Sequence, residues 1–168
     1  MPTSQQSSQP TYGVHLLRDV MIPMRDGVRL ATDIYVPCHG DGTVVDGKEK
    51  VPALLVRTSY DKTAPEWDDV SPYYVRRGYA FVIQDLRSRF RSEGDGSYFH
   101  TANPWEGDDG FDTVEWLATQ DWCTGKIGTL GSSHRAITQT QLALRKPPHL
   151  SAMWVEAGPT NIYRHEAR

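Results

Sequence analysis

The chain has 168 residues, a formal net charge of −3 and a mean hydropathy of −0.55, values that suit one globular domain of ordinary size. The acidic balance indicates no basic face, which argues against nucleic acid as a partner. No run of about 18 apolar residues is present, so no membrane span is expected and no membrane partner is predicted.

The first residues and the cysteines bear on location. Residues 1–10 are polar and lack the apolar stretch of a secretory signal. Residues 1–13 are expected to form a disordered tail ahead of a single domain over 14–168. Cys38 and Cys123 have no metal-ligand spacing, which favours free thiols in a reducing compartment and predicts a cytoplasmic location.

The first elements in chain order are β-prone. Residues 14–23 and 28–36 are apolar stretches separated by a segment that contains Asp26-Gly27, a strong hairpin signal. Residues 38–50 are rich in Gly and Asp and are predicted to form a loop. Residues 51–57 form a short apolar run, which is typical of a buried parallel strand.

Helices and strands then alternate. Ser71 and Pro72 are typical of a helix N-cap and first helical position, with Gly78 as the stop. Residues 79–84 form the next buried strand, and residues 85–104 form a long polar loop. Residues 107–119 are predicted to form an amphipathic helix with one apolar face: Phe111, Val114, Leu117 and Ala118. A strand over 127–130 precedes a helix over 133–144, which has on one side Ile137, Thr140, Ala143 and Leu144. The last predicted strand spans 151–155.

This order predicts an α/β fold with a mostly parallel sheet and helices on both faces. In such sheets the chemistry lies at the carboxyl ends of the strands. We therefore expect three loops to converge there: the loops after Arg57, after Gln84 and after Leu130.

The turn after Leu130 has the pattern of a nucleophile elbow, a sharp strand-to-helix turn that exposes a serine hydroxyl. Gly131 permits the tight turn and Ser133 stands at its apex. Ser133 is a candidate nucleophile for acyl transfer. An N-cap serine is favoured at the same kind of junction, and spacing alone does not separate the two interpretations.

Two further groups could stabilise an oxyanion beside Ser133. The phenol of Tyr60, after the strand over 51–57, and the backbone N–H of His134 are the candidate donors. A tyrosine that packs its ring at a strand end is the alternative for Tyr60. The His134 side chain is not expected to serve as the base for Ser133, because adjacent side chains at a helix start point about 100° apart.

The remaining charged residues have structural interpretations. Asp85 and Arg87 are predicted to form an ion pair with each other. Glu106, Asp108 and Asp109 lie at a helix start, where negative charge is favoured by the helix dipole. A solvated helix start is expected there and no metal site, and no cofactor is predicted.

Several motifs together resemble one family, the X-prolyl dipeptidyl-peptidase and cocaine-esterase-like serine hydrolases, also called CocE/NonD hydrolases. The matching segments run from about residue 15 to the end of the chain. They are residues 24–30, 57–62, 78–87, 92–94, 112–117, 122–123, and 125–128 continuing into 131–133.

The resemblance implies an α/β-hydrolase fold, of which this chain would hold the first six strands. It implies that Ser133 is the nucleophile and that Tyr60 and the backbone N–H of His134 form the oxyanion hole. Family substrates are small-molecule esters or peptides, namely acyl esters, amino-acid esters, X-Pro dipeptides or β-lactam side chains.

The sequence departs from the family pattern around the elbow. His134 stands where a tyrosine is usual, although Ala136 keeps the small residue further along. Arg135 places a charge on the elbow helix and must find a carboxylate or water, since a buried unpaired charge is costly. Ser59 replaces the proline that usually precedes Tyr60, which loosens the backbone there.

The chain is also much shorter than family members. The triad order of this fold is Ser, Asp, His, and no residue among these 168 can be assigned to the Asp or His role. One hypothesis is therefore a serine hydrolase seen in part and nearly inactive as this fragment. The other is a non-catalytic truncated remnant. In such a remnant the strand over 151–155 would leave an exposed sheet edge that invites self-association.

Overall fold

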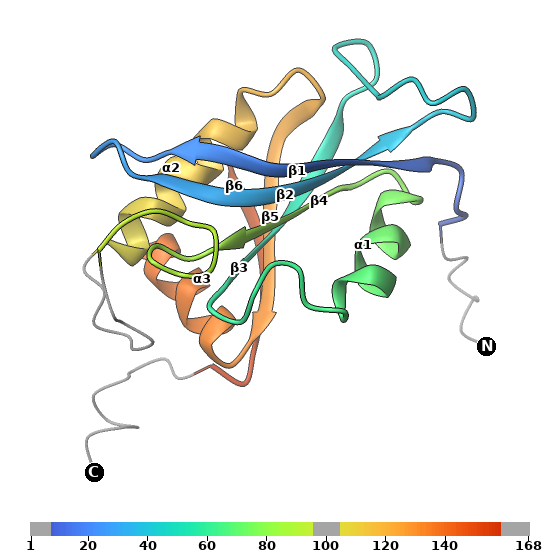
Figure 1. Ribbon diagram of the computed structural model, residues 1–168. Helices are drawn as coiled ribbons and strands as arrows, with labels where there is room; N and C mark the ends of the chain where they lie inside the picture. The colour runs from blue at the N-terminus through green and yellow to red at the C-terminus, as the bar shows by residue number, and fades with distance from the viewer. Residues whose placement is uncertain (1–7, 96–104, 159–168) are drawn as a thin grey trace, which may run out of the picture.

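The computed structural model describes residues 8–95 and 105–158, which form a six-stranded sheet flanked by helices (Figure 1). The strand order is β1-β2-β4-β3-β5-β6, and β4, β3, β5 and β6 run parallel. The strands are β1 (Gly13–Pro23), β2 (Arg29–Cys38), β3 (Val51–Thr58), β4 (Ala80–Asp85), β5 (Cys123–Ser132) and β6 (Leu150–Glu156). The predicted mostly parallel α/β sheet is confirmed.

The predicted hairpin joins β1 and β2 in antiparallel register. Gly27 has φ +89°, a conformation that favours glycine, and the Met24 N–H donates to the Val28 carbonyl at 2.8 Å. The expected tail falls partly outside the described residues, which begin at residue 8. Thr11 and Tyr12 already donate backbone hydrogen bonds to the Arg76 carbonyl, so this segment is tied to the domain.

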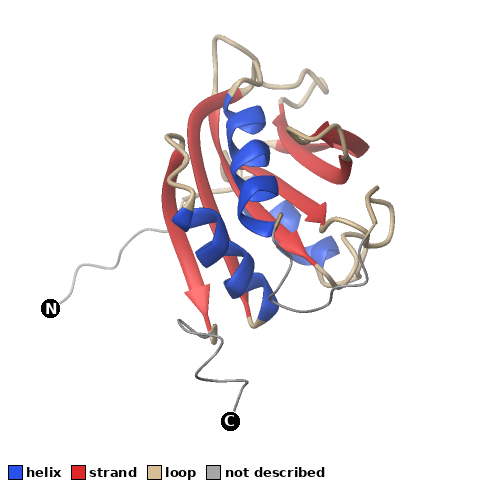
Figure 2. Ribbon diagram, turned by 90° about the vertical axis from the view of Figure 1, so that its left-hand side faces the viewer, coloured by secondary structure: helices blue, strands red, loops and turns tan. Residues whose placement is uncertain are grey.

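Helices cover both faces of the sheet, as predicted (Figures 1 and 2). α1 (Trp67–Val75) packs on one face, and α2 (Glu106–Ala118) and α3 (His134–Leu144) pack on the other. The core has a corresponding part on each face: Val56, Trp67 and Phe81 on the α1 side, and Leu55, Leu117 and Leu142 on the other. This sandwich fixes the parallel strand ends that carry the candidate site.

Two details of the predicted helices were wrong. α1 begins at Trp67, not after an N-cap at Ser71, which is buried within the helix. The indole of Trp67 is buried, and two aspartates in the first turn suit the positive end of the helix dipole, so the helix extends ahead of Pro72. On α3 the buried side contains Ile137, Thr138 and Leu142, whereas Leu144 is 70% exposed. The packing of α3 on α2 and β5 sets this rotation of the helix.

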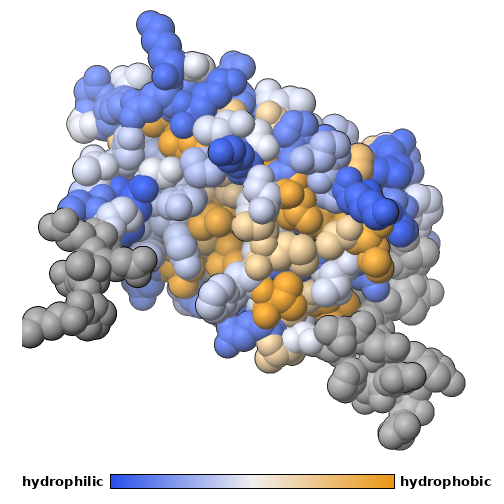
Figure 3. All heavy atoms as spheres, turned by 180° about the vertical axis from the view of Figure 1, so that it is seen from behind, coloured by the Kyte–Doolittle hydropathy of each residue, from blue (hydrophilic) through white to orange (hydrophobic). Residues whose placement is uncertain are grey.

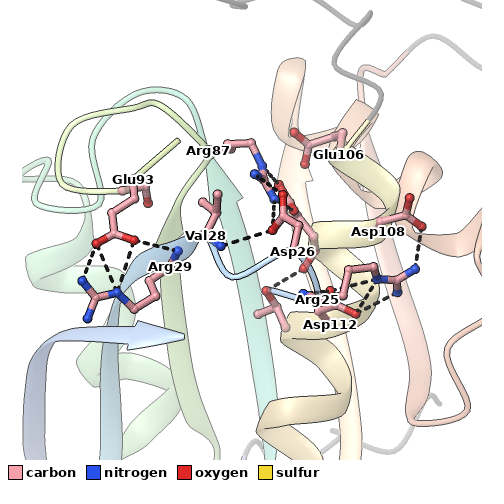
Figure 4. A network of polar contacts seen from close by, with 12 residues as sticks. Arg25, Asp26, Val28, Arg29, Arg87, Glu93, Glu106, Asp108 and Asp112 are labelled. Atoms are coloured by element: carbon pink, nitrogen blue, oxygen red, sulfur yellow. Dashed lines mark hydrogen bonds and ion pairs between the residues drawn. The ribbon is translucent and has the colours of Figure 1, made fainter. Parts of the chain in front are cut away.

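The predicted Asp85–Arg87 ion pair was also wrong. Arg87 pairs with Asp26 of the hairpin at 2.7 Å (Figure 4). It also pairs with Asp109 of α2 at 2.6 Å. Its hydrogen bond holds the pKa of Asp26 below its usual range. Asp85 instead accepts hydrogen bonds from the backbone N–H groups of Lys62 and Arg91. The β1–β2 turn is therefore bound to the start of α2 by charged groups.

The prediction of a solvated start for the helix that begins at Glu106 was also wrong, because its acidic residues are paired with arginines. Glu106 and Asp109 are buried, and Glu106 pairs with Arg57 of β3. Desolvation raises the pKa of Glu106, although the charge of Arg57 opposes the shift. On the surface, Arg25 binds Asp112 and Asp108 beside this network (Figure 4). The sequence indicated helix-dipole stabilisation here but not the arginines that approach from β3 and from the segment after β4.

Candidate active site

The elbow, residues 131–133, lies where β5 ends and α3 begins. Ser133 has φ +56° and ψ −124°, a strained backbone conformation for a residue with a side chain. It occupies the N-cap position of α3, but its side chain makes no capping hydrogen bond. Ser133 thus occupies the N-cap position, but its side chain does not cap the helix. Ser133 is exposed, and its hydroxyl donates or accepts no hydrogen bond that caps α3.

The sharpness of the turn depends on small residues. A Cβ on Gly131, which has φ +154°, would lie 2.5 Å from the Cβ of Arg135. A Cβ on Gly158, after β6, would lie 2.4 Å from the Cβ of Ala136. The Ser133 N–H donates to the Glu156 carbonyl at 3.1 Å, which binds the elbow to the end of β6. The small side chain of Ala136 therefore leaves room for the backbone that follows β6 at Gly158.

The three predicted loops converge at this end of the sheet. The Leu86 N–H, just after β4, donates to the Thr58 carbonyl of β3 at 3.0 Å. Tyr60, after β3, places its ring against the ring of His134 at the start of α3, with centroids 6.4 Å apart and planes at 80°. The structure thus brings together Tyr60 and the residue that follows Ser133, the groups that the sequence predicts for an oxyanion site.

The imidazole of His134 is turned toward β3. Its Nδ1 lies 3.3 Å from the Ser59 Oγ, and both residues are buried. The ring therefore contacts the Ser59–Tyr60 segment, and the expectation that it does not act as the base for Ser133 stays a prediction.

Arg135 is paired with a carboxylate, as the cost of burying an unpaired charge led us to expect. Its guanidinium binds the Glu66 carboxylate at 2.6 Å and lies over the rings of Trp67 and Tyr60, 5.1 and 5.7 Å from their centroids. Such contacts between a cation and aromatic faces are attractive. Glu66, just before α1, was not predicted, because an acidic residue near a helix start is common and signals no particular partner.

Lys62 was also missed by sequence reasoning. Its side chain is 1% exposed, and its Nζ lies 2.7 Å from carboxylate oxygens of both Asp19 and Asp33. Its backbone N–H donates to Asp85, whose pKa desolvation raises to about 6. This buried cation holds the segment after Tyr60 against β1 and β2. No sequence signal distinguishes it from an ordinary surface lysine.

Two other histidines have glutamate partners. His149 binds Glu115 at 2.9 Å and precedes β6, so it lies at the end of the sheet opposite the elbow. His39 lies 3.2 Å from Glu49, beyond the end of β2. The assignment of the triad Asp and His to residues outside this chain stays a prediction.

A hollow of about 670 Å³ lies on the sheet face between α1 and β6. Its wall is largely apolar, as Figure 3 shows, and includes Val56, Trp67, Leu130 and Trp154. Among the described lining residues are Gly131 and Ser132 but not Ser133. The hollow is thus an apolar sheet face that passes beneath the elbow.

Within residues 8–95 and 105–158 no helix has the length and apolarity to cross a bilayer, and no group of three or more His, Cys, Asp or Glu side chains is arranged to hold a metal ion. Cys38 and Cys123 are buried free thiols.

Comparison with known proteins identifies the family. The profile of the X-Pro dipeptidyl-peptidase (S15 family) matches residues 26–168. The cocaine esterase of Rhodococcus sp. strain MB1 Bresler is 39% identical over 150 residues, which cover 87% of this chain and 24% of that protein. The chain thus spans about a quarter of the length of the curated relatives it matches.

Solved structures agree in fold. A CocE/NonD family hydrolase from Staphylococcus aureus superposes with a TM-score of 0.73 and 28% identity, covering 90% of this chain and 29% of that chain. An α-amino acid ester hydrolase gives a TM-score of 0.68 and 30% identity over 96% of this chain and 28% of its own. The chain therefore belongs to the X-Pro dipeptidyl-peptidase (S15) family of hydrolases and has the fold of part of their α/β-hydrolase domain.

Proposed function

We propose that this chain carries the nucleophile and oxyanion site of a serine hydrolase that acts on esters or amides through an acyl-enzyme on Ser133. The observation that supports this most strongly is the strained backbone of Ser133, whose exposed side chain makes no capping bond to α3. Strain of this kind is retained at functional sites because the surrounding structure holds it in place.

The reaction would follow the standard course of acyl transfer. The Ser133 Oγ bonds to the carbonyl carbon while its proton passes to a general base, and the carbonyl oxygen gains negative charge. Tyr60 and the backbone N–H of His134 would donate to that oxyanion. The carbonyl then re-forms, the alcohol or amine leaves with a proton, and water releases the acid from Ser133.

The relatives indicate the substrate class. Their names include a cocaine esterase, an α-amino acid ester hydrolase and an X-Pro dipeptidyl-peptidase. We infer that the substrates here are small carboxylic esters, amino-acid esters or X-Pro peptides. We also place the protein in the cytoplasm, because its two thiols are buried and unpaired, which suits a reducing compartment.

Turnover by the 168-residue chain alone is expected to be very low. In known triads, loss of members costs on the order of 10⁴ to 10⁶ in rate. The general base and its carboxylate partner would come from polypeptide outside these residues. The alternative, a non-catalytic remnant, predicts that Ser133 has no enhanced reactivity at all.

Covalent labelling separates these alternatives. A fluorophosphonate probe is expected to label the wild-type chain and the matched control Ser132→Ala, while Ser133→Ala removes the label. Ser132 is the control because it is the neighbouring serine at the end of β5. Labelling that is absent, or that persists in Ser133→Ala, would favour the remnant.

A further inference from the structure

The positions at which the sequence departs from the family pattern meet around one ring. Ser59 lies in the loop after β3, whereas His134 and Arg135 lie at the start of α3, yet all three are next to Tyr60. Ser59 is its chain neighbour, the His134 ring meets it edge-on, and the Arg135 guanidinium lies over it at 5.7 Å. Three changes that look independent in the sequence form one cluster in space.

The Ser59–His134 contact restricts the histidine ring. The Ser59 Oγ and the His134 Nδ1 are 3.3 Å apart, and the two residues are only 5% and 9% exposed. Buried polar atoms require a hydrogen-bond partner, so this contact favours one orientation of the imidazole. In that orientation the ring edge faces Tyr60.

Tyr60 depends on such contacts for its position. It is 40% exposed, and the residue after it, Asp61, has φ +77°, so the loop turns sharply directly behind the ring. Ser59 does not fix φ as a proline would. Arg135 supplies a second wall, and it is itself held by Glu66 and by the face of Trp67.

We propose that His134, oriented by Ser59, is a positioning residue for Tyr60, with the Arg135 guanidinium over the Tyr60 ring as a second contact. Ser59 and His134 then act together: the Ser59 hydroxyl anchors the imidazole, and the imidazole holds the loop that carries Tyr60. The catalytic meaning of this arrangement rests on the proposed function of Tyr60, whereas the positioning itself does not.

The test uses ¹⁹F NMR of the full chain labelled with 3-fluorotyrosine, in which Tyr60→Phe identifies the Tyr60 resonance. Ser59→Ala removes the hydroxyl, and His134→Phe keeps a ring edge but removes Nδ1. Each is expected to shift the Tyr60 resonance, and the double variant to shift it no further than the larger single change. Ser59→Thr, which keeps the hydroxyl, is expected to restore the wild-type position.

The matched controls are Ser151→Ala and His15→Phe, both at exposed positions away from the elbow, which should leave the Tyr60 resonance in place. An unmoved resonance in Ser59→Ala and His134→Phe, or strictly additive shifts, would overturn the proposal. Thermal unfolding monitors folding, and if His134→Phe does not fold, the Ser59→Ala and Ser59→Thr pair decides.

Fluorophosphonate labelling separates this proposal from the proposed function. Ser59→Ala is expected to slow labelling of Ser133 by about tenfold, a part of the 10²- to 10³-fold loss typical of removing an oxyanion donor. A shifted Tyr60 resonance with no labelling in any variant would uphold the positioning and contradict the proposed function. Equal and measurable labelling rates in wild type and Ser59→Ala would contradict a contribution of the Tyr60 position to the reaction of Ser133, whereas the Tyr60 resonance decides the positioning itself.

Discussion

At the scale of single residues, the candidate site is built from strained or buried groups. Ser133 has positive φ, Gly131 leaves no room for a Cβ, and Lys62 is a buried cation between two carboxylates. Each feature costs free energy when considered alone. Their concentration at the carboxyl ends of the parallel strands agrees with a site that the rest of the fold stabilises.

Asp85 is expected to make the stability of the folded chain depend on pH. Burial raises its pKa to about 6 in the folded chain, against 3.8 in the unfolded chain. The folded state therefore holds the proton more tightly, and this group's contribution to stability is lost as pH rises from about 4 to 6. The loss amounts to at most about 3 kcal/mol.

Asp85→Asn is expected to remove that loss, since the amide oxygen can still accept from the Lys62 N–H. Urea unfolding at several pH values measures the difference between the two proteins. The stability of the variant relative to wild type should rise between pH 4 and pH 7. A constant difference across this range would show that the pKa of Asp85 is the same in the folded and unfolded states.

At the scale of elements, buried charges bind α2 to the sheet. Arg57 of β3 is 3% exposed, and its guanidinium donates to Gln84, to the Glu106 carboxylate and to the Glu106 carbonyl. Removing one partner of such a pair leaves a buried charge, which typically costs 3–5 kcal/mol.

Glu106→Ala is therefore expected to destabilise the chain by roughly 3 kcal/mol. Glu93→Ala is the matched control, because the Glu93–Arg29 pair is exposed and its loss is expected to destabilise the chain much less. Denaturant unfolding of both variants gives the comparison. Equal losses in the two would mean that burial of the Arg57 pair has no special weight.

The secondary-structure elements could largely be predicted from the sequence, whereas the contacts between them could not. The apolar runs and the Gly and Pro signals predicted the strands, because burial in a parallel sheet demands such runs. Long-range side-chain pairs such as Arg57–Glu106 and Ser59–His134 could not be predicted from sequence, since they depend on which strand ends become neighbours in the fold. The start of α1 was missed because Pro72 looked like a first-turn residue although the burial of Trp67 extends the helix.

At the scale of the whole molecule, β6 forms an edge of the sheet, and residues 151–156 are exposed. No charged residue occurs from Leu150 to Val155, and Trp154 is 69% exposed beside the apolar hollow. Natural edge strands are usually protected by charges, prolines or covering segments. We propose that the isolated chain self-associates through this edge.

Sedimentation velocity over a range of protein concentrations tests the proposed association. Trp154→Lys places a charge on the edge and should weaken association by about tenfold or more. Leu144→Lys is the matched control, because Leu144 is 70% exposed but lies on α3. A monomeric wild-type chain, or equal effects of the two substitutions, would contradict association through β6.

The central claim is that Ser133 forms an acyl-enzyme, and trapping that intermediate tests it most directly. The chain is treated with p-nitrophenyl acetate and the site of acetylation is mapped by peptide mass spectrometry. Because the base that would speed deacylation is expected to be absent, any acetyl-enzyme should persist. We predict an acetyl group on Ser133 that is absent in Ser133→Ala and retained in Ser132→Ala. Acetylation confined to lysines, with Ser133 unmodified, would contradict the account.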